Sequence, residues 1–141
     1  MNLRVILFAL TMAGFSTLAK GQDLNTYQWN HRLVLLLTAD SNQAQFQEQL
    51  ALFDKDKDGL VERKLKIISA TPSHSRSGSK AWGKNAELYQ KYHRKGDFEF
   101  ILIGLDGGVK LRRSDLMSLK ALYRIIDSMP MRAAEMRRKN N

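Results

Sequence analysis

The sequence contains no cysteine, and this absence excludes several kinds of chemistry. None of the 141 residues is Cys, and only three are His. A chain without thiols cannot use a thiol catalyst, attach haem through thioether bonds or hold a metal through cysteine. The three histidines, His31, His74 and His93, are too scattered in sequence to form a metal-binding pair. We therefore exclude a thiol oxidoreductase or peroxidase and expect no cofactor.

Long hydrophobic runs are also lacking. The apolar stretch from Val5 to Ala19 is shorter than the ~20 residues that span a bilayer. It follows Arg4, and Ala19-Lys20-Gly21 then places small residues where a signal peptidase cuts. An uncleaved membrane anchor is the alternative. We expect residues 1–21 to be a signal peptide and the mature protein to be periplasmic or secreted, with no transmembrane segment.

Acidic residues are few relative to basic ones. Without residues 1–21 the chain carries 21 Lys and Arg against 14 Asp and Glu, a formal charge of +7. The segment 74–95 combines cations with aromatic rings, which could hold a polyanion through charge and stacking. In the alternative interpretation the rings face the core and the cations face water. The residues concerned are Arg76, Lys80, Lys84, Lys91, Arg94 and Lys95, with Trp82, Tyr89 and Tyr92. No dense basic run stands out, so nucleic acid is not an expected partner.

The first half of the mature chain predicts a strand, a helix and a strand. Residues 32–38 form a continuous apolar run, typical of a strand buried on both faces. Phe46, Leu50 and Phe53 then lie at helical spacing, with Asp40 or Ser41 as the helix cap. Residues 64–71 alternate between Lys and apolar residues, which predicts a second strand.

The second half begins with a predicted loop at residues 72–80, which are rich in Ser. A helix is expected from about Trp82 to just before Gly96. Alternating residues on either side of an Asp-Gly turn predict a hairpin over residues 98–113.

Two helices are expected to end the chain. Ser114 can cap a helix that runs to Ile126, and Pro130 would terminate it. Residues 131–138 predict a short basic helix. The order is β-α-β-α-β-β-α, and its β-α-β opening implies a right-handed parallel crossover. We predict one α/β domain over residues 22–138, a thioredoxin-like three-layer fold with a mixed four-stranded sheet, followed by a polar tail at 139–141.

Four stretches carry a family resemblance. They are WNHRLVLLL (29–37), GLVER (59–63), IGLDGGVKLRR (103–113) and IDSMPMRAAEMRR (126–138). The chain resembles a domain of unknown function in bacterial exported proteins, which also occurs in equarin and the sushi-repeat extracellular proteins. The resemblance implies a thioredoxin-like fold related to peroxiredoxins. It also implies a family whose bacterial members have no established activity, while animal members are associated with matrix and adhesion.

The resemblance also implies where a redox centre would lie. Enzymes of this fold carry their reactive cysteine just after the first strand, where a helix begins. Residues 38–42 take that place here, and Ser41 forms neither a disulfide nor a sulfenic acid. The proline expected near Gly96-Asp97 is also missing. Both departures indicate a domain without redox activity.

Five charged residues of the resembling stretches form the candidate site. They are Arg112, Arg113, Asp127, Arg132 and Glu135. One interpretation is ion pairing that fastens the terminal segment to the sheet, since arginine–carboxylate pairs commonly fix geometry. The other is a surface for a ligand or partner. We favour the first and expect Asp127 and Arg132, which flank Pro130, to form an ion pair.

The acidic segment 54–65 resembles the start of an EF-hand loop. Asp54, Asp56, Asp58 and Glu62 occupy calcium-ligand positions, and Gly59 occupies the sharp turn. Position 12 of such a loop should be a bidentate Glu but is Leu65, which also belongs to the predicted strand. We expect an acidic turn between helix and strand, with weak calcium binding at most.

These observations predict an exported, redox-inactive module that binds an unknown protein or a polyanionic ligand. A calcium-dependent structural module that uses residues 54–65 is one alternative. An enzyme with an unrecognised non-thiol site is the other.

Overall fold

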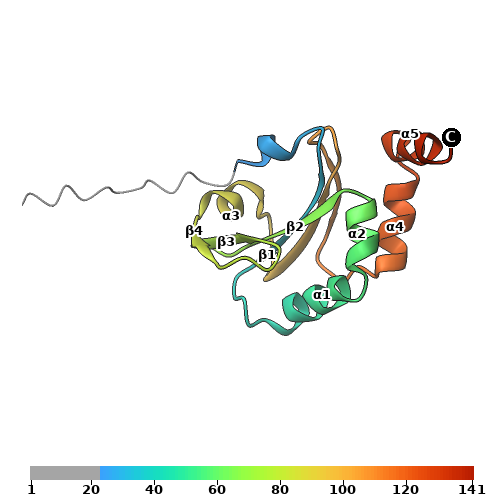
Figure 1. The fold of residues 1–141 in the computed structure, drawn as a ribbon. Helices are drawn as coiled ribbons and strands as arrows, with labels where there is room; N and C mark the ends of the chain where they lie inside the picture. The colour runs from blue at the N-terminus through green and yellow to red at the C-terminus, as the bar shows by residue number, and fades with distance from the viewer. Residues whose placement is uncertain (1–22) are drawn as a thin grey trace, which may run out of the picture.

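A six-stranded mixed sheet forms the centre of the molecule. The computed structural model describes residues 23–141 (Figure 1), so the predicted signal peptide lies outside the described residues. The sheet order is β4-β3-β2-β1-β5-β6. β1 runs parallel to β2, and every other neighbouring pair is antiparallel. The strands are β1 (Arg32–Thr38), β2 (Leu65–Ala70), β3 (His74–Ser77), β4 (Gly83–Lys84), β5 (Phe98–Ile103) and β6 (Val109–Arg113).

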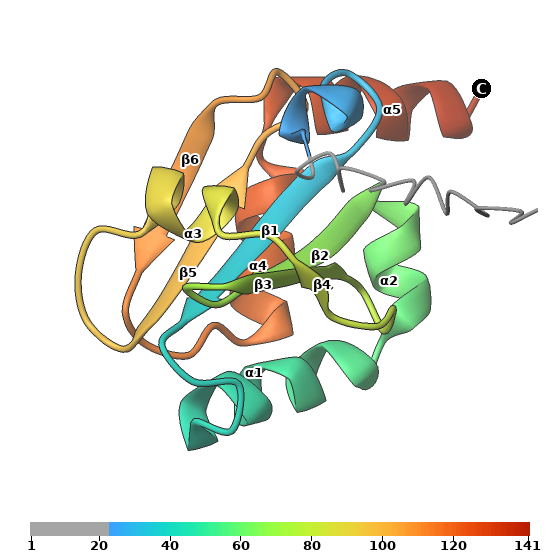
Figure 2. The same cartoon turned by 90° about the vertical axis from the view of Figure 1, so that its left-hand side faces the viewer.

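Helices cover both faces of this sheet. α1, α2 and α4 lie on one face, while α3 and the 3-10 helix η1 lie on the other (Figures 1 and 2). The helices are η1 (Leu24–Tyr27), α1 (Ala44–Asp54), α2 (Lys57–Glu62), α3 (Glu87–Tyr92), α4 (Leu119–Asp127) and α5 (Pro130–Lys139). Within residues 23–141, no helix combines the length and the apolarity needed to span a bilayer.

β1 is buried along its whole length, as its apolar run predicts. Side chains of a strand alternate between the two faces. Val34 and Leu36 therefore pack in the cluster under α1 and α4, while Leu33 and Leu35 pack in the cluster under α3. The parallel β1–β2 pair and the β5–β6 hairpin confirm the α/β arrangement predicted from the element order.

The predicted number of strands is wrong, because β3 and β4 extend the sheet at one edge. β3 lies within residues 72–80, which the sequence predicts as a loop. It pairs through its backbone with β2, from Ile68↔Ser77 to Ala70↔Ser75. Only Ser75 of this strand is buried, so the strand has no apolar alternation and gives no periodic signal.

Several helix ends also differ from the predicted ones. α1 is capped by Gln43 rather than by Asp40 or Ser41, and α4 by Ser118 rather than Ser114. α3 starts at Glu87, later than predicted. α4 ends at Asp127, and Pro130 is the first residue of α5. Proline suits this position because the first helical N–H needs no intrahelical partner.

Candidate functional site

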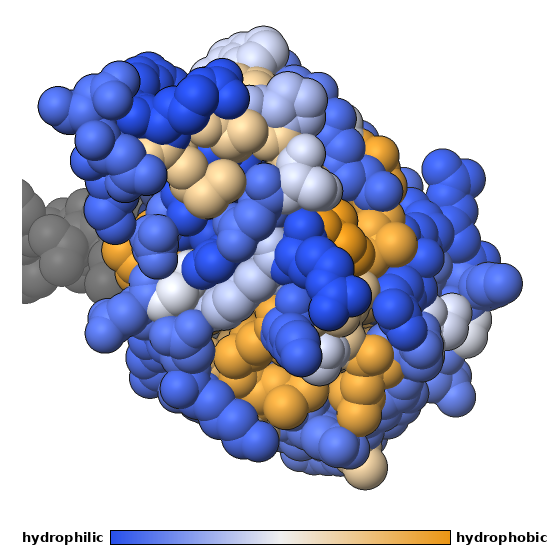
Figure 3. Space-filling view, turned by 90° about the vertical axis from the view of Figure 1, so that its right-hand side faces the viewer, coloured by the Kyte–Doolittle hydropathy of each residue, from blue (hydrophilic) through white to orange (hydrophobic). Residues whose placement is uncertain are grey.

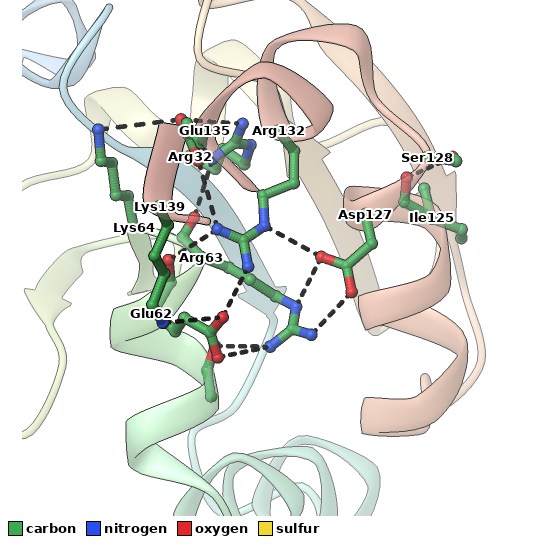
Figure 4. A network of polar contacts seen from close by, with 11 residues as sticks. Arg32, Glu62, Arg63, Lys64, Ile125, Asp127, Ser128, Arg132, Glu135 and Lys139 are labelled. Carbon is green, nitrogen blue, oxygen red and sulfur yellow. Dashed lines mark hydrogen bonds and ion pairs between the residues drawn. The ribbon is translucent and has the colours of Figure 1, made fainter. Parts of the chain in front are cut away.

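Asp127, at the C-terminal end of α4, accepts hydrogen bonds from two arginines (Figure 4). Arg63 approaches with two nitrogens, at 2.7 Å from Nη2 to Oδ2 and 3.0 Å from Nε to Oδ1. Arg132 donates from Nε to Oδ1 at 3.1 Å. Partial burial alone would raise the pKa of Asp127, but hydrogen bonds from Arg63 and Arg132 outweigh it and hold that pKa below its usual value. The carboxylate is therefore charged at neutral pH.

Arg132 connects α5 to α2 as well as to α4. Its side chain is only 4 % exposed. It donates to the backbone oxygen of Glu62 at 3.1 Å and to Oε1 of Glu62 at 3.0 Å. Burial would lower the pKa of Arg132, but the hydrogen bonds to Asp127 and Glu62 raise it above its usual value. A buried guanidinium is thus surrounded by oxygens on three sides.

Arg32 and Glu135 form the most buried pair of the same network. The Arg32 side chain is fully buried, and its Nη1 lies 3.3 Å from Oε2 of Glu135. Nη1 also donates to the backbone oxygen of Arg63 at 3.0 Å. Glu135 further pairs with Arg132 at 3.5 Å and with Lys64 at 3.8 Å. A charge buried this deeply needs its partner, because losing one member leaves the other uncompensated.

The network joins β1, α2, α4 and α5 into one unit (Figure 4). It contains Asp127, Arg132 and Glu135 of the candidate site, with the expected ion pair between Asp127 and Arg132. Arg32, Glu62 and Arg63 also belong to the network, and none of them is among the five predicted residues. Two signals in the sequence point to these residues. Glu62 and Arg63 lie in GLVER, one of the stretches that carry the resemblance, and Arg32 is the one charged residue of the predicted first strand. Because these side chains are paired with one another, the geometry favours fastening of α5 over ligand binding.

Arg112 and Arg113 take no part in this network. Arg112 donates to Glu99 at 3.1 Å and to the backbone oxygen of Tyr92 at 2.8 Å. Glu99 is itself buried and accepts a 2.7 Å hydrogen bond from the backbone N–H of Arg94. Arg113 forms an ion pair with the exposed Asp115. The five predicted residues therefore divide into three separate groups.

The segment after β1, where the resemblance places a redox centre, is a turn closed by its own hydrogen bonds. The Thr38 hydroxyl donates to the backbone oxygen of Asp40 at 2.8 Å. The Asp40 carboxylate accepts from the N–H of Asn42 at 2.9 Å, and Gln43 caps α1 through the N–H of Phe46. No peptide bond within residues 23–141 is cis. The polar groups of this turn are thus used to shape the backbone.

The acidic segment is helical rather than the predicted turn. Asp56 caps α2 by accepting from the N–H of Gly59 at 2.9 Å, while Asp54 pairs with Lys57 at 3.4 Å. α2 then leads directly to β2, where Leu65 is buried, as predicted for a strand residue. Across residues 23–141, no three acidic or histidine side chains come close enough together to hold a metal ion.

The aromatic rings of residues 74–95 pack towards the core. Trp82 lies against Phe46 in the first hydrophobic cluster, with ring centroids 6.4 Å apart. Tyr89 and Tyr92 pack on the second cluster, and Tyr89 stacks on His93. The rings therefore face inwards, and the cations face water except for Arg76, which is half-buried over the Trp82 ring.

A cleft of about 560 Å³ lies between α1, α2 and the β2–β3 edge of the sheet. Its lining combines apolar side chains with two cations. The residues concerned are Leu50, Phe53, Leu60 and Ile67, with Lys57 and Arg76. Ligand sites are typically concave, mostly apolar and supplied with a few polar groups, so this cleft is the second candidate site. The face that carries α4 and α5 is mainly hydrophilic, with apolar patches between the hydrophilic side chains (Figure 3).

The fold of this chain, which lacks cysteine, is similar to that of two solved peroxidase structures. The structure superposes on the reduced 2-Cys peroxiredoxin of Plasmodium vivax with a TM-score of 0.59 and 15% identity, covering 79% of this chain and 72% of that one. It superposes on thioredoxin peroxidase I of Plasmodium yoelii with a TM-score of 0.60 and 14% identity, covering 79% of each chain. At such low identity the likeness concerns the fold alone.

The chain belongs to the DUF4174 family, a domain of unknown function, whose model matches residues 23–135. Among curated proteins, none matches the sequence. The fold is therefore that of peroxidases, while the absence of cysteine removes the thiol on which such enzymes depend.

Proposed function

We propose that this chain is an exported, redox-inactive binding module whose ligand occupies the cleft between α1, α2 and the β2–β3 edge. The cleft itself is the observation that carries the proposal. Its volume of about 560 Å³ lies within the range of ~300–1,000 Å³ typical of small-molecule sites. Its apolar lining supplies affinity, and its cations supply orientation.

Two further features support a binding role. The polar groups after β1 are tied into a local turn, and the C-terminal arginines and carboxylates neutralise one another. Neither group is free to perform acid–base chemistry on a substrate. Export is supported by the charged, apolar and small-residue parts of residues 1–21.

The proposal is tested by native mass spectrometry of protein purified from the exported fraction of cells that make it. Ala51 is exposed and lines the cleft, so Ala51→Trp should fill it without disturbing the core. Ala39→Trp is the matched control, since Ala39 is an exposed alanine in the turn after β1.

The wild type and Ala39→Trp should carry a ligand of defined mass that Ala51→Trp lacks. Loss of that ligand from Ala39→Trp alone would move the site to the turn after β1. Ligand-free protein in all three samples, or turnover of peroxide by the wild type, would contradict the proposal.

A further inference from the structure

Arg76 in the wall of the cleft is a cation without an acidic partner. It belongs to β3, and within residues 23–141 no carboxylate pairs with it. Its guanidinium carbon lies 4.6 Å from the centroid of the Trp82 ring, and its Nε is buried without a hydrogen-bond partner. A buried guanidinium nitrogen without a hydrogen-bond partner is unfavourable, and no carboxylate of the described residues offsets the charge of Arg76.

The other charges of the cleft do not compensate Arg76. Lys57 and Asp54 also line it, but they pair with each other at 3.4 Å. The local balance is therefore one uncompensated positive charge, within a chain of net positive charge. This balance is complementary to one negative charge on the ligand.

The rest of the lining requires an apolar ligand body. Leu50 comes from α1, Leu60 from α2 and Ile67 from β2, so the apolar surface is continuous across three elements. Burial of aliphatic carbon there contributes ~25 cal/mol for each Å² removed from water. A small inorganic anion would leave this surface uncovered.

We propose that the cleft binds an amphipathic carboxylate, with the carboxylate on the Arg76 guanidinium and an aliphatic body along Leu50, Leu60 and Ile67. This inference rests on the proposed binding function and names the ligand class of the same site. The planar guanidinium presents two parallel N–H donors to a carboxylate, which a lysine cannot do. Its stacking on Trp82 holds that fork in place.

The test uses decanoate as the probe, below its critical micelle concentration, and decanol as the uncharged molecule of equal chain length. Affinity is measured by calorimetry on the mature protein. Site occupancy is read from Trp82 fluorescence in a Trp29→Phe background, which leaves one tryptophan of the original two. Arg76→Gln removes the proposed contact. Arg124→Gln is the control, because Arg124 is exposed and has no ion pair in the described part of the chain.

Decanoate should bind at one site and change the Trp82 emission. Arg76→Gln should weaken it roughly tenfold to a hundredfold, as for loss of a hydrogen bond between charged groups. Arg124→Gln should leave the affinity unchanged, and decanol should bind wild type about as weakly as decanoate binds Arg76→Gln.

Equal affinity for decanoate and decanol, with no effect of Arg76→Gln, would overturn the carboxylate assignment while leaving a binding cleft. Absence of binding by either probe would also overturn it. The proposed function would then stand only if native mass spectrometry still shows a ligand that Ala51→Trp loses.

Discussion

Asp127 shares one carboxylate between arginines from two different parts of the chain. Arg63 follows α2 and Arg132 lies in α5, yet both contact Oδ1 of Asp127 at 3.0–3.1 Å. Arg63 also stacks 3.9 Å from the centroid of the Tyr123 ring. The hydroxyl of Tyr123 donates to the backbone oxygen of Asp56. Burial, together with the nearby Asp56 carboxylate, raises the pKa of Tyr123 to about 12. Arg63 and Arg132 therefore share Asp127 as an ion-pair partner, and Arg63 also packs on Tyr123.

Asp127→Ala should lower the free energy of unfolding by about 1–3 kcal/mol, because it leaves two partly buried guanidinium groups without their shared acceptor. Urea unfolding measures the change. Asp115→Ala is the control, since it breaks an exposed Arg–Asp pair and should change stability little. Unchanged stability in Asp127→Ala would return Asp127 and Arg132 to the candidate ligand-binding residues.

The stability that the Asp127 carboxylate contributes depends on pH, because the pKa of Asp127 is lowered in the folded protein. A carboxylate whose pKa is lower in the folded state stabilises the fold above its unfolded pKa, near 3.8, and loses this effect as pH falls through the folded pKa. The stability gap between wild type and Asp127→Asn should thus be constant above about pH 5 and shrink below about pH 4. A gap that widens on acidification would refute the assigned sign.

At the scale of elements, the acidic segment 54–65 is not a calcium-binding loop, because its residues 57–62 form helix α2. Asp56 caps it, and Gly59 allows α4 to approach, since a Cβ there would lie 2.6 Å from Oη of Tyr123. α2 ends at Glu62, and the chain enters β2 at Leu65, on the side of the sheet packed by the first hydrophobic cluster. The residue that would close an EF-hand cage is instead a core residue.

Leu65→Glu discriminates between these two roles. In a buried strand the added carboxylate should destabilise the domain by several kcal/mol, because it is removed from water without a partner. In a calcium loop it should complete the cage and create tight binding. Melting curves with and without about 10 mM calcium separate the outcomes. We expect a lower melting temperature that calcium does not restore; calcium-dependent rescue would favour the EF-hand.

An element can be predicted from the sequence when the residues that stabilise it are close together in the chain. β1 was predictable because a run of apolar residues suffices to define a central strand. β3 was not, because its pairing with β2 uses backbone groups that any sequence carries. Likewise, the burial of Arg32 depends on Glu135, which lies 103 positions away, so no local pattern reveals that pair. The expected Asp127–Arg132 contact spans only five positions around Pro130, and it was predictable.

For the whole molecule, the proposed export would set the conditions under which it works. The first clear element of the sequence is the charged, apolar and small-residue pattern of residues 1–21. Its removal leaves a chain of formal charge +7 without any cysteine that oxidising conditions could pair. Such a domain relies on its apolar core and on the Arg32–Glu135 network for stability.

Purified exported protein should therefore begin at Gln22. Intact mass spectrometry after expression of the full chain measures this directly. The control replaces Ala19 with Arg, which places a large charged residue three positions before the cut and should block processing. Retention of residues 1–21 on membrane-bound wild-type protein would show an anchor instead of a signal peptide.

The proposed ligand occupies the cleft between α1, α2, β2 and β3, away from the turn after β1. Amide chemical-shift mapping tests this placement most directly, with isotope-labelled mature protein titrated with the ligand recovered from the exported fraction. We expect shifts concentrated at residues 47–60, 67 and 76–79, around the cleft. Shifts concentrated at residues 38–42, after β1, or at 127–135, in the C-terminal network, would contradict it.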